Sequence, residues 1–288
     1  MAYNGSIPPF VYVIVLNWNG WCDTLRCLAS VDRLEYPNYR LLIVDNCSTD
    51  DSVDRIRAAR PDIFLIQTDK NLGFAGGNNL GIRHALDQGA EYVWLLNNDT
   101  VVDSRSLTTM VDLAEEDSRV GLVGSVLYYM DKPEKVQIWG GAYVYFWYGI
   151  VRNREAPTNH SELQHIIGAS MLIKRALIED IGLLDERYFM GWEDIDYGFK
   201  ARNNGWKLKT ASASVVWHKV SASSRKDLTR GQKDWNVAAV CFFAKNHPLP
   251  IVPIFIGVGG RFLKRVVRGE WKRALATLQG ALEGWKQC

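Results

Sequence analysis

The first hundred residues alternate short apolar segments with segments of helical periodicity, and this alternation constrains the fold more than any other feature of the chain. Apolar, β-preferring segments that end in polar turn formers are found at residues 11–16, 40–44, 63–66 and 92–96. Helical patterns follow them, starting near residues 23, 48, 77 and 104. Such an alternation predicts an α/β fold whose mostly parallel central sheet is covered by helices on both faces.

The later part of the chain has a different texture. Residues 120–148 are rich in Val, Tyr, Trp and Gly, which predicts antiparallel strands or long loops. A helix is expected at residues 230–246, where Pro248 ends it. We expect a domain at residues 1–246, with a nucleotide-binding part at about 10–100 and an acceptor-binding and catalytic part at about 101–246, and a C-terminal helical extension at 247–288.

Composition and charge exclude several classes of protein. The chain has 288 residues, 47% of them hydrophobic, which is enough for a large core. Residues 1–10 lack the pattern of a secretory signal, so we expect a cytoplasmic protein. The net charge of +2 disfavours nucleic acid as a partner. The five cysteines show no paired two-residue spacing, so we expect neither a disulfide framework nor a zinc cage.

Polar side chains follow the predicted strands at the points where ligands of open α/β sheets bind. Asn17 follows the first strand, Asp45 ends the second, and Asp99 follows the fourth. A carboxylate at the end of the second strand can accept a hydrogen bond from a nucleoside, and capping of the following turn is the alternative role for Asp45.

A glycine-rich run occupies residues 71–81, after the third strand. Glycines there allow backbone N–H groups to approach a ligand at the start of a helix. The run does not match the dinucleotide-binding pattern, which would follow the first strand, and the chain contains no Gly-Lys-Ser or Gly-Lys-Thr sequence of the ATPase type.

Two further clusters provide groups for metal binding and acid–base chemistry. Asp99 needs further ligands to hold a divalent metal, and His218, at the end of a later apolar strand, can add an imidazole. The alternative is that His218 has a purely structural role. A predicted helix begins with Glu193, Asp194 and Asp196, and three carboxylates are more than helix capping requires. One of these carboxylates is a suitable general base for a hydroxyl group.

In this order the clusters resemble those of the family 2 glycosyltransferases, which are inverting enzymes of the nucleotide-diphosphosugar transferase (GT-A) fold. Within that family the chain looks most like bacterial rhamnosyltransferases and related polysaccharide-building enzymes. The resemblance covers roughly residues 11–246, and its matching segments are residues 13–19, 45–50, 71–81, 96–99, 168–171, 182–186, 192–196 and 205–206, with His218.

The resemblance implies a role for particular residues. Asp99 and His218 would coordinate a divalent metal, Mn²⁺ or Mg²⁺, and Asp194 would be the catalytic base. Trp192 and Glu193 are expected to contact the acceptor. The expected donor-binding residues are Leu16, Asn17, Asp45, Asn71, Gly76, Asn78 and Asn98.

The implied activity is metal-dependent, inverting hexosyl transfer. The donor would be a dTDP- or UDP-sugar, with rhamnose as a candidate sugar, and the acceptor a hydroxyl of a saccharide or lipid-linked molecule in the synthesis of a cell-surface polysaccharide such as cell wall or O-antigen. The chain departs from the family motif at Asn97, where an acid is usual, so one strong carboxylate remains for the metal.

Two other functions are alternatives. A nucleotidyltransferase of the same fold would need a basic glycine-rich motif after the first strand, and residues 17–20 are not of that kind. A non-catalytic protein that binds sugar nucleotides would not need Asp194 and Asp99.

The C-terminal extension combines an apolar segment with a basic one. Residues 248–260 contain no charge, but thirteen residues are too few to span a bilayer as a helix. Six basic residues and one acid follow at residues 261–273, with Trp271 and Trp285 nearby. This pattern favours peripheral contact with the cytoplasmic face of the inner membrane. A helical appendage packed on the catalytic domain, or on another subunit of a homo-oligomer, is the alternative.

Overall fold

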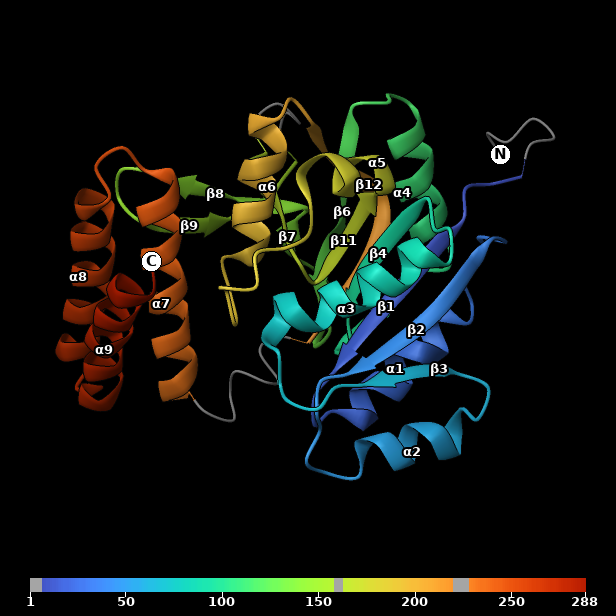
Figure 1. Cartoon of the computed structure of the whole chain (residues 1–288), viewed down its shortest axis with the longest axis horizontal. Helices are drawn as coiled ribbons and strands as arrows, with labels where there is room; N and C mark the ends of the chain where they lie inside the picture. Colours follow the sequence, from blue (N-terminus) through green and yellow to red (C-terminus); the bar gives the residue numbers. More distant parts are fainter. Residues whose placement is uncertain (1–6, 158–162, 220–227) are drawn as a thin grey trace.

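The computed structural model describes residues 7–157, 163–219 and 228–288. Its centre is a nine-stranded sheet in the order β3-β2-β1-β4-β11-β6-β12-β5, with β7 paired to β6 outside this path. Helices cover both faces of the sheet, and three C-terminal helices form one end of the molecule (Figure 1). The layered α/β architecture that the sequence predicts is present.

The first half of the sheet is parallel. It consists of β1 (Val11–Asn17), β2 (Tyr39–Asp45), β3 (Phe64–Gln67) and β4 (Tyr92–Asn97), connected by α1 (Trp21–Val31), α2 (Ser52–Ala59) and α3 (Gly73–Asp87). In the register of β1, Asn17 lies opposite Asp45 on one side, and Leu16 lies opposite Asn97 on the other. The polar residues that end these three strands therefore meet at one edge of the sheet.

The second half of the sheet is mixed. Its strands are β5 (Thr100–Val102), β6 (Val120–Tyr129), β7 (Lys132–Trp139), β11 (Ser170–Lys174) and β12 (Lys207–His218). β11 runs antiparallel to both of its neighbours, β4 and β6, whereas β12 runs parallel to β6. A separate antiparallel sheet contains β8 (Gly141–Tyr145), β9 (Ile150–Asn153) and β10 (His165–Ile166). The antiparallel strands expected within residues 120–148 are confirmed.

Side-chain alternation along β1 divides the core into two layers, because successive residues of a strand face opposite sides of the sheet. The remaining covering helices are α4 (Ser106–Glu115), α5 (Arg175–Ile181) and α6 (Glu193–Asn203). Val11, Val13 and Val15 pack in the layer under α1 and α4. Tyr12 and Ile14 pack in the layer under α3, α5 and α6.

The glycine-rich run at residues 71–81 is mostly helix, because α3 begins at Gly73 rather than near residue 77. An added Cβ at Gly77 would lie 2.5 Å from Leu16 Cδ1, and one at Gly81 would lie 2.8 Å from Ile14 Cγ2. These glycines allow α3 to lie close to β1.

The C-terminal helices are α7 (Leu228–Asn246), α8 (Ile251–Val267) and α9 (Trp271–Gln287). Phe242 and Phe243 of α7 share a hydrophobic cluster with Trp192, which precedes α6, and with Ile195 of α6. α7 also packs along α9, so it contacts both the predicted domain at residues 1–246 and the predicted extension at 247–288. The boundary between these two parts stays a prediction. No helix in the described part of the chain has the length and apolarity to cross a membrane.

A disulfide joins Cys241 of α7 to Cys288, with their Cα atoms 5.4 Å apart. The expectation that the cysteines form no disulfide was therefore wrong for this pair. The two residues are 47 positions apart, and only the packing of α9 alongside α7 brings them together, which no local spacing reveals.

We predict that Gly198→Ala destabilises the protein, because an added Cβ would lie 2.5 Å from His165 Cα and 2.7 Å from Gln164 O. Both contacts are with the backbone beside α6, so the helix must move. The free energy of unfolding in urea should fall by about 1–3 kcal/mol. Gly231→Ala in α7 is the matched control, since no atom lies within 4 Å of its added Cβ, and it should raise that free energy by roughly 1 kcal/mol. Equal effects in the two variants would contradict the packing argument.

Candidate active site

The ends of β1 and β2 are joined by a hydrogen-bond network around the buried Asp45 carboxylate. Asn17 Nδ2 donates to Asp45 Oδ2 at 2.7 Å. Ser48 donates twice, from its backbone N to Oδ1 at 2.9 Å and from its hydroxyl to Oδ2 at 2.7 Å. Asp45 thus organises the turn after β2, which is the capping role that the sequence left as an alternative, and its oxygens are mostly occupied by the protein itself.

The same network extends to β4 through Asn17 Oδ1. This oxygen accepts hydrogen bonds from Thr24 Oγ1 at 2.7 Å and from Asn98 Nδ2 at 3.3 Å. Asn98 Nδ2 also contacts Thr24 Oγ1 at 3.0 Å. Asn98 therefore holds the β4 end against the start of α1. Thr24, which the sequence indicated only as a candidate helix cap, is part of this connection.

Asn46 anchors the loop that enters α3. Its Nδ2 donates to Asn71 Oδ1 at 3.0 Å and to Gly73 O at 2.9 Å, and its Oδ1 accepts from Leu72 N at 2.9 Å. Asn71 Oδ1 also accepts from Gly73 N at 2.9 Å. Asn46 was not among the predicted site residues, although an amide that directly follows a strand end is a signal that the sequence offers.

The first turns of α3 hold Gly76 and Asn78, which we predict to bind the donor. An added Cβ at Gly76 would lie 2.8 Å from Leu72 Cβ, so glycine is required there by packing. Asn78 is almost fully buried; its Nδ2 donates to Phe74 O at 2.9 Å, and its Oδ1 has no protein partner. An unsatisfied buried acceptor costs free energy, so Asn78 Oδ1 is available for a ligand donor or a water.

Asp99 lies in the turn after β4, and His218 is the last residue of β12; their side chains face each other. His218 Nε2 lies 3.3 Å from Asp99 Oδ1, and both side chains are mostly buried. His218 Nδ1 lies 3.1 Å from Gln137 Oε1, an oxygen that can only accept, so Nδ1 carries the proton and Nε2 is directed at Asp99. Gln137 on β7 was not singled out from the sequence, because its role depends on a strand pairing.

The Asp99–His218 pair fits a divalent metal site. Two ligands that each lie about 2.1 Å from one ion at a right angle are about 3 Å apart, close to the separation observed here. A hydrogen bond that fixes the other ring nitrogen is typical of metal-binding histidines. Within the described ranges no group of three or more His, Cys, Asp or Glu side chains is assembled, so an ion at this pair would take further ligands from substrate or water.

The three carboxylates at the start of α6 have different surroundings. Asp196 accepts from Lys245 Nζ at 2.7 Å and from Asn246 Nδ2 at 3.1 Å, and so attaches α7. Burial and the adjacent Asp194 carboxylate raise the pKa of Glu193 to about 8, and its Oε2 has no protein partner. Glu193 is therefore mainly protonated at neutral pH, which leaves Asp194 as the carboxylate suited to accept a proton.

Asp194 is positioned by backbone groups that lead to the end of β4. Its Oδ2 accepts from Gly168 N at 3.0 Å, and its Oδ1 accepts from Ile195 N at 2.8 Å. The next residue after Gly168, Ala169, accepts from Asn97 N at 3.0 Å. The base candidate on α6 and the metal-ligand candidate after β4 are thus connected to the same edge of the sheet, although they lie far apart in the sequence.

With this geometry in place, comparison with known proteins identifies the family. The model of the family "Glycosyl transferase family 2" matches residues 12–182, which is more than half of the chain. The chain belongs to glycosyl transferase family 2. It is 26% identical over 224 residues to the N-acetylglucosaminyl-diphospho-decaprenol L-rhamnosyltransferase of Mycobacterium tuberculosis, covering 69% of this chain and 73% of that protein.

A further relative is the low-salt glycan biosynthesis hexosyltransferase Agl10 of Haloferax volcanii, 26% identical over 66% of this chain and 61% of that protein. Among solved structures, a mannosyltransferase from Pyrobaculum calidifontis in complex with GDP-Man and Mn²⁺ has a TM-score of 0.63 at 18% identity and covers 96% of this chain and 87% of that chain. GalNAc-T7 with UDP, GalNAc and Mn²⁺ has a TM-score of 0.65 at 13% identity. This match covers 86% of this chain and 50% of that chain. These likenesses confirm the expected GT-A fold.

Trp192 occupies a different environment from the one expected for an acceptor-binding residue of this glycosyltransferase. Its side chain is fully buried, and its ring centroid lies 5.0 Å from that of Phe242 and 5.3 Å from that of Phe243. The ring therefore presents no face to a sugar. Two other aromatic residues, Tyr145 and Trp147, are exposed, and the Trp147 ring contacts His247.

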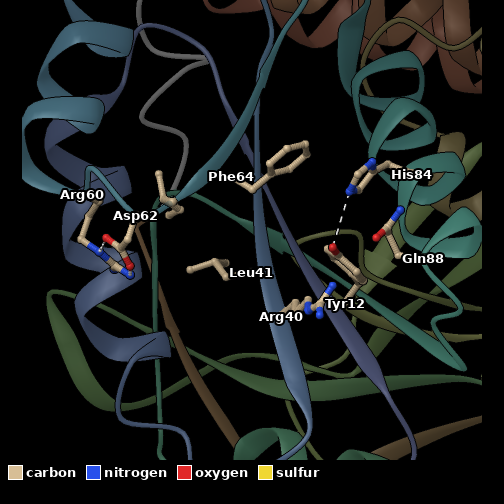
Figure 2. A pocket seen from close by; sticks show the side chains of 9 residues that line it. Tyr12, Arg40, Leu41, Arg60, Asp62, Phe64, His84 and Gln88 are labelled. Carbon is tan, nitrogen blue, oxygen red and sulfur yellow. Dashed lines mark hydrogen bonds and ion pairs between the residues drawn. The ribbon is translucent and has the colours of Figure 1, made fainter.

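The glycosyltransferase also has a cavity of about 380 Å³ away from this edge. Figure 2 shows its lining side chains, which include Tyr12, Arg40, Phe64 and His84. Tyr12, Arg40 and Phe64 lie at the amino ends of β1, β2 and β3, opposite the ends that carry Asn17 and Asp45. This cavity is therefore not the candidate active site.

We predict that Glu193→Gln stabilises the enzyme increasingly as the pH rises. Because the pKa of Glu193 is raised in the folded state, its contribution to stability is fully present below its unfolded pKa of about 4.5 and is lost as the pH rises through about 8. A neutral glutamine does not lose that contribution. The difference in free energy of unfolding between variant and wild type should grow by roughly 1–3 kcal/mol between pH 5 and pH 8 in urea titrations. A difference that stays constant over this range would contradict the burial of a neutral Glu193.

Proposed function

We propose that this family 2 glycosyltransferase transfers a sugar, with inversion, from a nucleoside-diphosphate donor to a hydroxyl of a saccharide or lipid-linked acceptor in the synthesis of a cell-surface polysaccharide. The observation that carries the proposal is the connection of the Asp194 carboxylate to the end of β4, next to the Asp99–His218 pair. This arrangement suits a reaction in which one group removes a proton while a charged leaving group departs nearby.

In this proposal Asp194 accepts the proton of the acceptor hydroxyl as its oxygen forms a bond to the anomeric carbon. The bond from that carbon to the diphosphate oxygen breaks in the same displacement, so the anomeric centre inverts. Glu193 supports Asp194 because a protonated neighbour adds no second negative charge beside the attacking oxygen. We retain Glu193 as an acceptor-contacting residue, since its free Oε2 needs a partner.

The donor is proposed to bind along the ends of β1, β2 and β4 and the start of α3. Asn17, Asp45 and Asn98 would act mainly by holding the nucleoside-binding edge in shape, because their polar atoms bond to one another and to Ser48 and Thr24. The residues proposed to lie along the nucleoside, diphosphate and sugar are Leu16, Asn71, Gly76 and Asn78.

Asp99 and His218 are proposed to hold Mn²⁺ or Mg²⁺, and support comes from the two Mn²⁺-containing relatives in fold. When bound, the ion would offset the charge that develops on the leaving diphosphate. Gln137 Oε1 would accept a hydrogen bond from His218 Nδ1–H, which leaves the lone pair of Nε2 available for the metal.

For the donor sugar we propose rhamnose, carried on dTDP or UDP. The support is the similarity to the mycobacterial N-acetylglucosaminyl-diphospho-decaprenol L-rhamnosyltransferase. Thermal stabilisation by a set of nucleotide sugars, including dTDP-rhamnose and UDP-rhamnose, tests this proposal about substrate class.

Asp194→Asn should lower the transfer rate by about 10²–10⁴-fold, because the amide cannot accept the acceptor proton. The affinity for UDP or dTDP, measured by calorimetry in the presence of Mn²⁺, should stay within about threefold of wild type, since the base acts on the acceptor. The matched control is Glu193→Gln at pH 7, which should keep the rate within about tenfold because Glu193 is already mainly neutral there. A reversal of the two effects would assign the base to Glu193.

Asp99→Ala should remove the effect of Mn²⁺ on nucleotide binding. In wild type, Mn²⁺ should increase the thermal stabilisation produced by UDP or dTDP, because a ligand that binds only the folded state raises its apparent stability. Asp103→Ala is the matched control; the Asp103 carboxylate accepts from Arg105 N near the start of α4 and does not face His218. The metal assignment fails if Asp99→Ala and Asp103→Ala respond to Mn²⁺ alike.

A further inference from the structure

The helices α8 and α9 expose large apolar side chains at helical spacing. Phe255 and Val267 of α8 are each 79% exposed, and Trp271 and Leu282 of α9 are 61% and 65% exposed. With Leu263 and Leu275, these residues form what we call the docking face. Figure 1 places α8 and α9 at the outer edge of the molecule, away from the central sheet. An exposed apolar face of this kind marks an interaction surface.

The packing of α9 explains why its large residues point outward. The residues that α9 buries are small, and an added Cβ at Gly284 would lie 2.7 Å from Val237 O of α7. At Gly280 an added Cβ would overlap the carbonyl oxygen of Lys233. This close backbone approach leaves no space for leucine or tryptophan between α7 and α9. The arrangement is the reverse of an ordinary amphipathic helix in a soluble bundle, which buries its large apolar residues.

The charges around the docking face are almost all positive. Residues 251–287 contain seven basic residues and two acidic ones. Glu270 is paired with Arg265 and Arg273, and Glu283 with Lys233. Lys264, Arg268 and Lys272 are exposed, and the ion pairs found within the described ranges do not include them. Both carboxylates are therefore neutralised by ion pairs, whereas Lys264, Arg268 and Lys272 are exposed without such a pair in the described part of the chain.

We propose that α8 and α9 dock the enzyme on an anionic lipid bilayer, with the docking face in the headgroup region and Lys264, Arg268 and Lys272 near the lipid phosphates. Apolar side chains bordered by cations are the pattern of interfacial helices. Trp271 suits the boundary because its ring is apolar and its N–H is polar. The contact is peripheral, since no described helix has the length and apolarity to cross a membrane.

A second copy of the chain fits this surface less well than lipid does. In a symmetric dimer the same patch of each protomer meets its equivalent. The exposed cations would then approach one another with no unpaired carboxylate of α8 or α9 to offset them. An anionic bilayer supplies both the missing negative charge and the apolar phase.

The proposal is tested by flotation of the full chain with vesicles. The probes are pure phosphatidylcholine and phosphatidylcholine mixed with phosphatidylglycerol, each at low and high salt. Wild type should float with the anionic vesicles, and high salt should reduce the bound fraction. Lys264→Glu/Lys272→Glu should lower the partition coefficient by more than roughly tenfold, because each cation near the surface contributes a factor of about five. Arg57→Glu/Lys132→Glu reverses two exposed charges elsewhere and should leave partitioning within about twofold.

A second pair of variants tests the apolar contact. Phe255→Gln/Leu275→Gln should abolish flotation. The control is Ile7→Gln, which replaces a residue that is 85% exposed and distant in sequence from α8 and α9, and it should float like wild type. Failure of wild type to float with anionic vesicles would overturn the proposal, as would equal losses in the charge variants and their control. A dimer in light scattering that Phe255→Gln/Leu275→Gln converts to monomer, without flotation of wild type, would assign the face to self-association. Transfer to a soluble acceptor should be unchanged in all these variants, so this result is independent of the proposed reaction.

Discussion

The hydrogen bond from Asn17 to the buried Asp45 carboxylate is the contact on which the geometry of the site depends. A buried carboxylate without partners is strongly destabilising, so the chain has to place donors around it. Asn17 and Ser48 supply them, which requires β1 and β2 to end at the same level. The other side of Asn17 then accepts from Thr24 and Asn98, which fixes the start of α1 and the end of β4. The hydrogen bonds around the Asp45 carboxylate and Asn17 therefore align the ends of β1, β2 and β4.

The sequence predicted the first half of the fold well, because β1 to β4 are apolar segments whose pattern is local. It did not predict β11 between β4 and β6, since the choice of neighbour for Ser170–Lys174 depends on contacts distant in sequence. The same limit explains the disulfide of Cys241 and Cys288. The helical start of α3 was also missed, because Gly76 and Gly77 are usual in turns and become helical here through packing against Leu72 and Leu16.

The candidate site was predicted in position more accurately than in detail. Asp99 and His218 do face each other, as expected of metal ligands, but Gln137, which orients the imidazole, comes from a strand pairing that no motif indicates. A polar residue at a strand end can face a ligand or another part of the chain, and the sequence alone does not distinguish these. The three acids of α6 show this most clearly: Asp196 binds α7, Glu193 is buried with a raised pKa, and Asp194 is held by Gly168 N.

The antiparallel strand β11 has a consequence for how the enzyme is made. β4 is the last strand of the parallel half, and its outer neighbour consists of Ser170–Lys174, which the ribosome produces much later. During synthesis the parallel half of the sheet therefore has an apolar strand with an unpaired edge, of the kind that promotes association between chains. The same delay separates Asp99 from Asp194 in time. The half proposed to bind the donor can fold early, but Asp194, the proposed base, reaches the end of β4 only after β11 has closed the sheet.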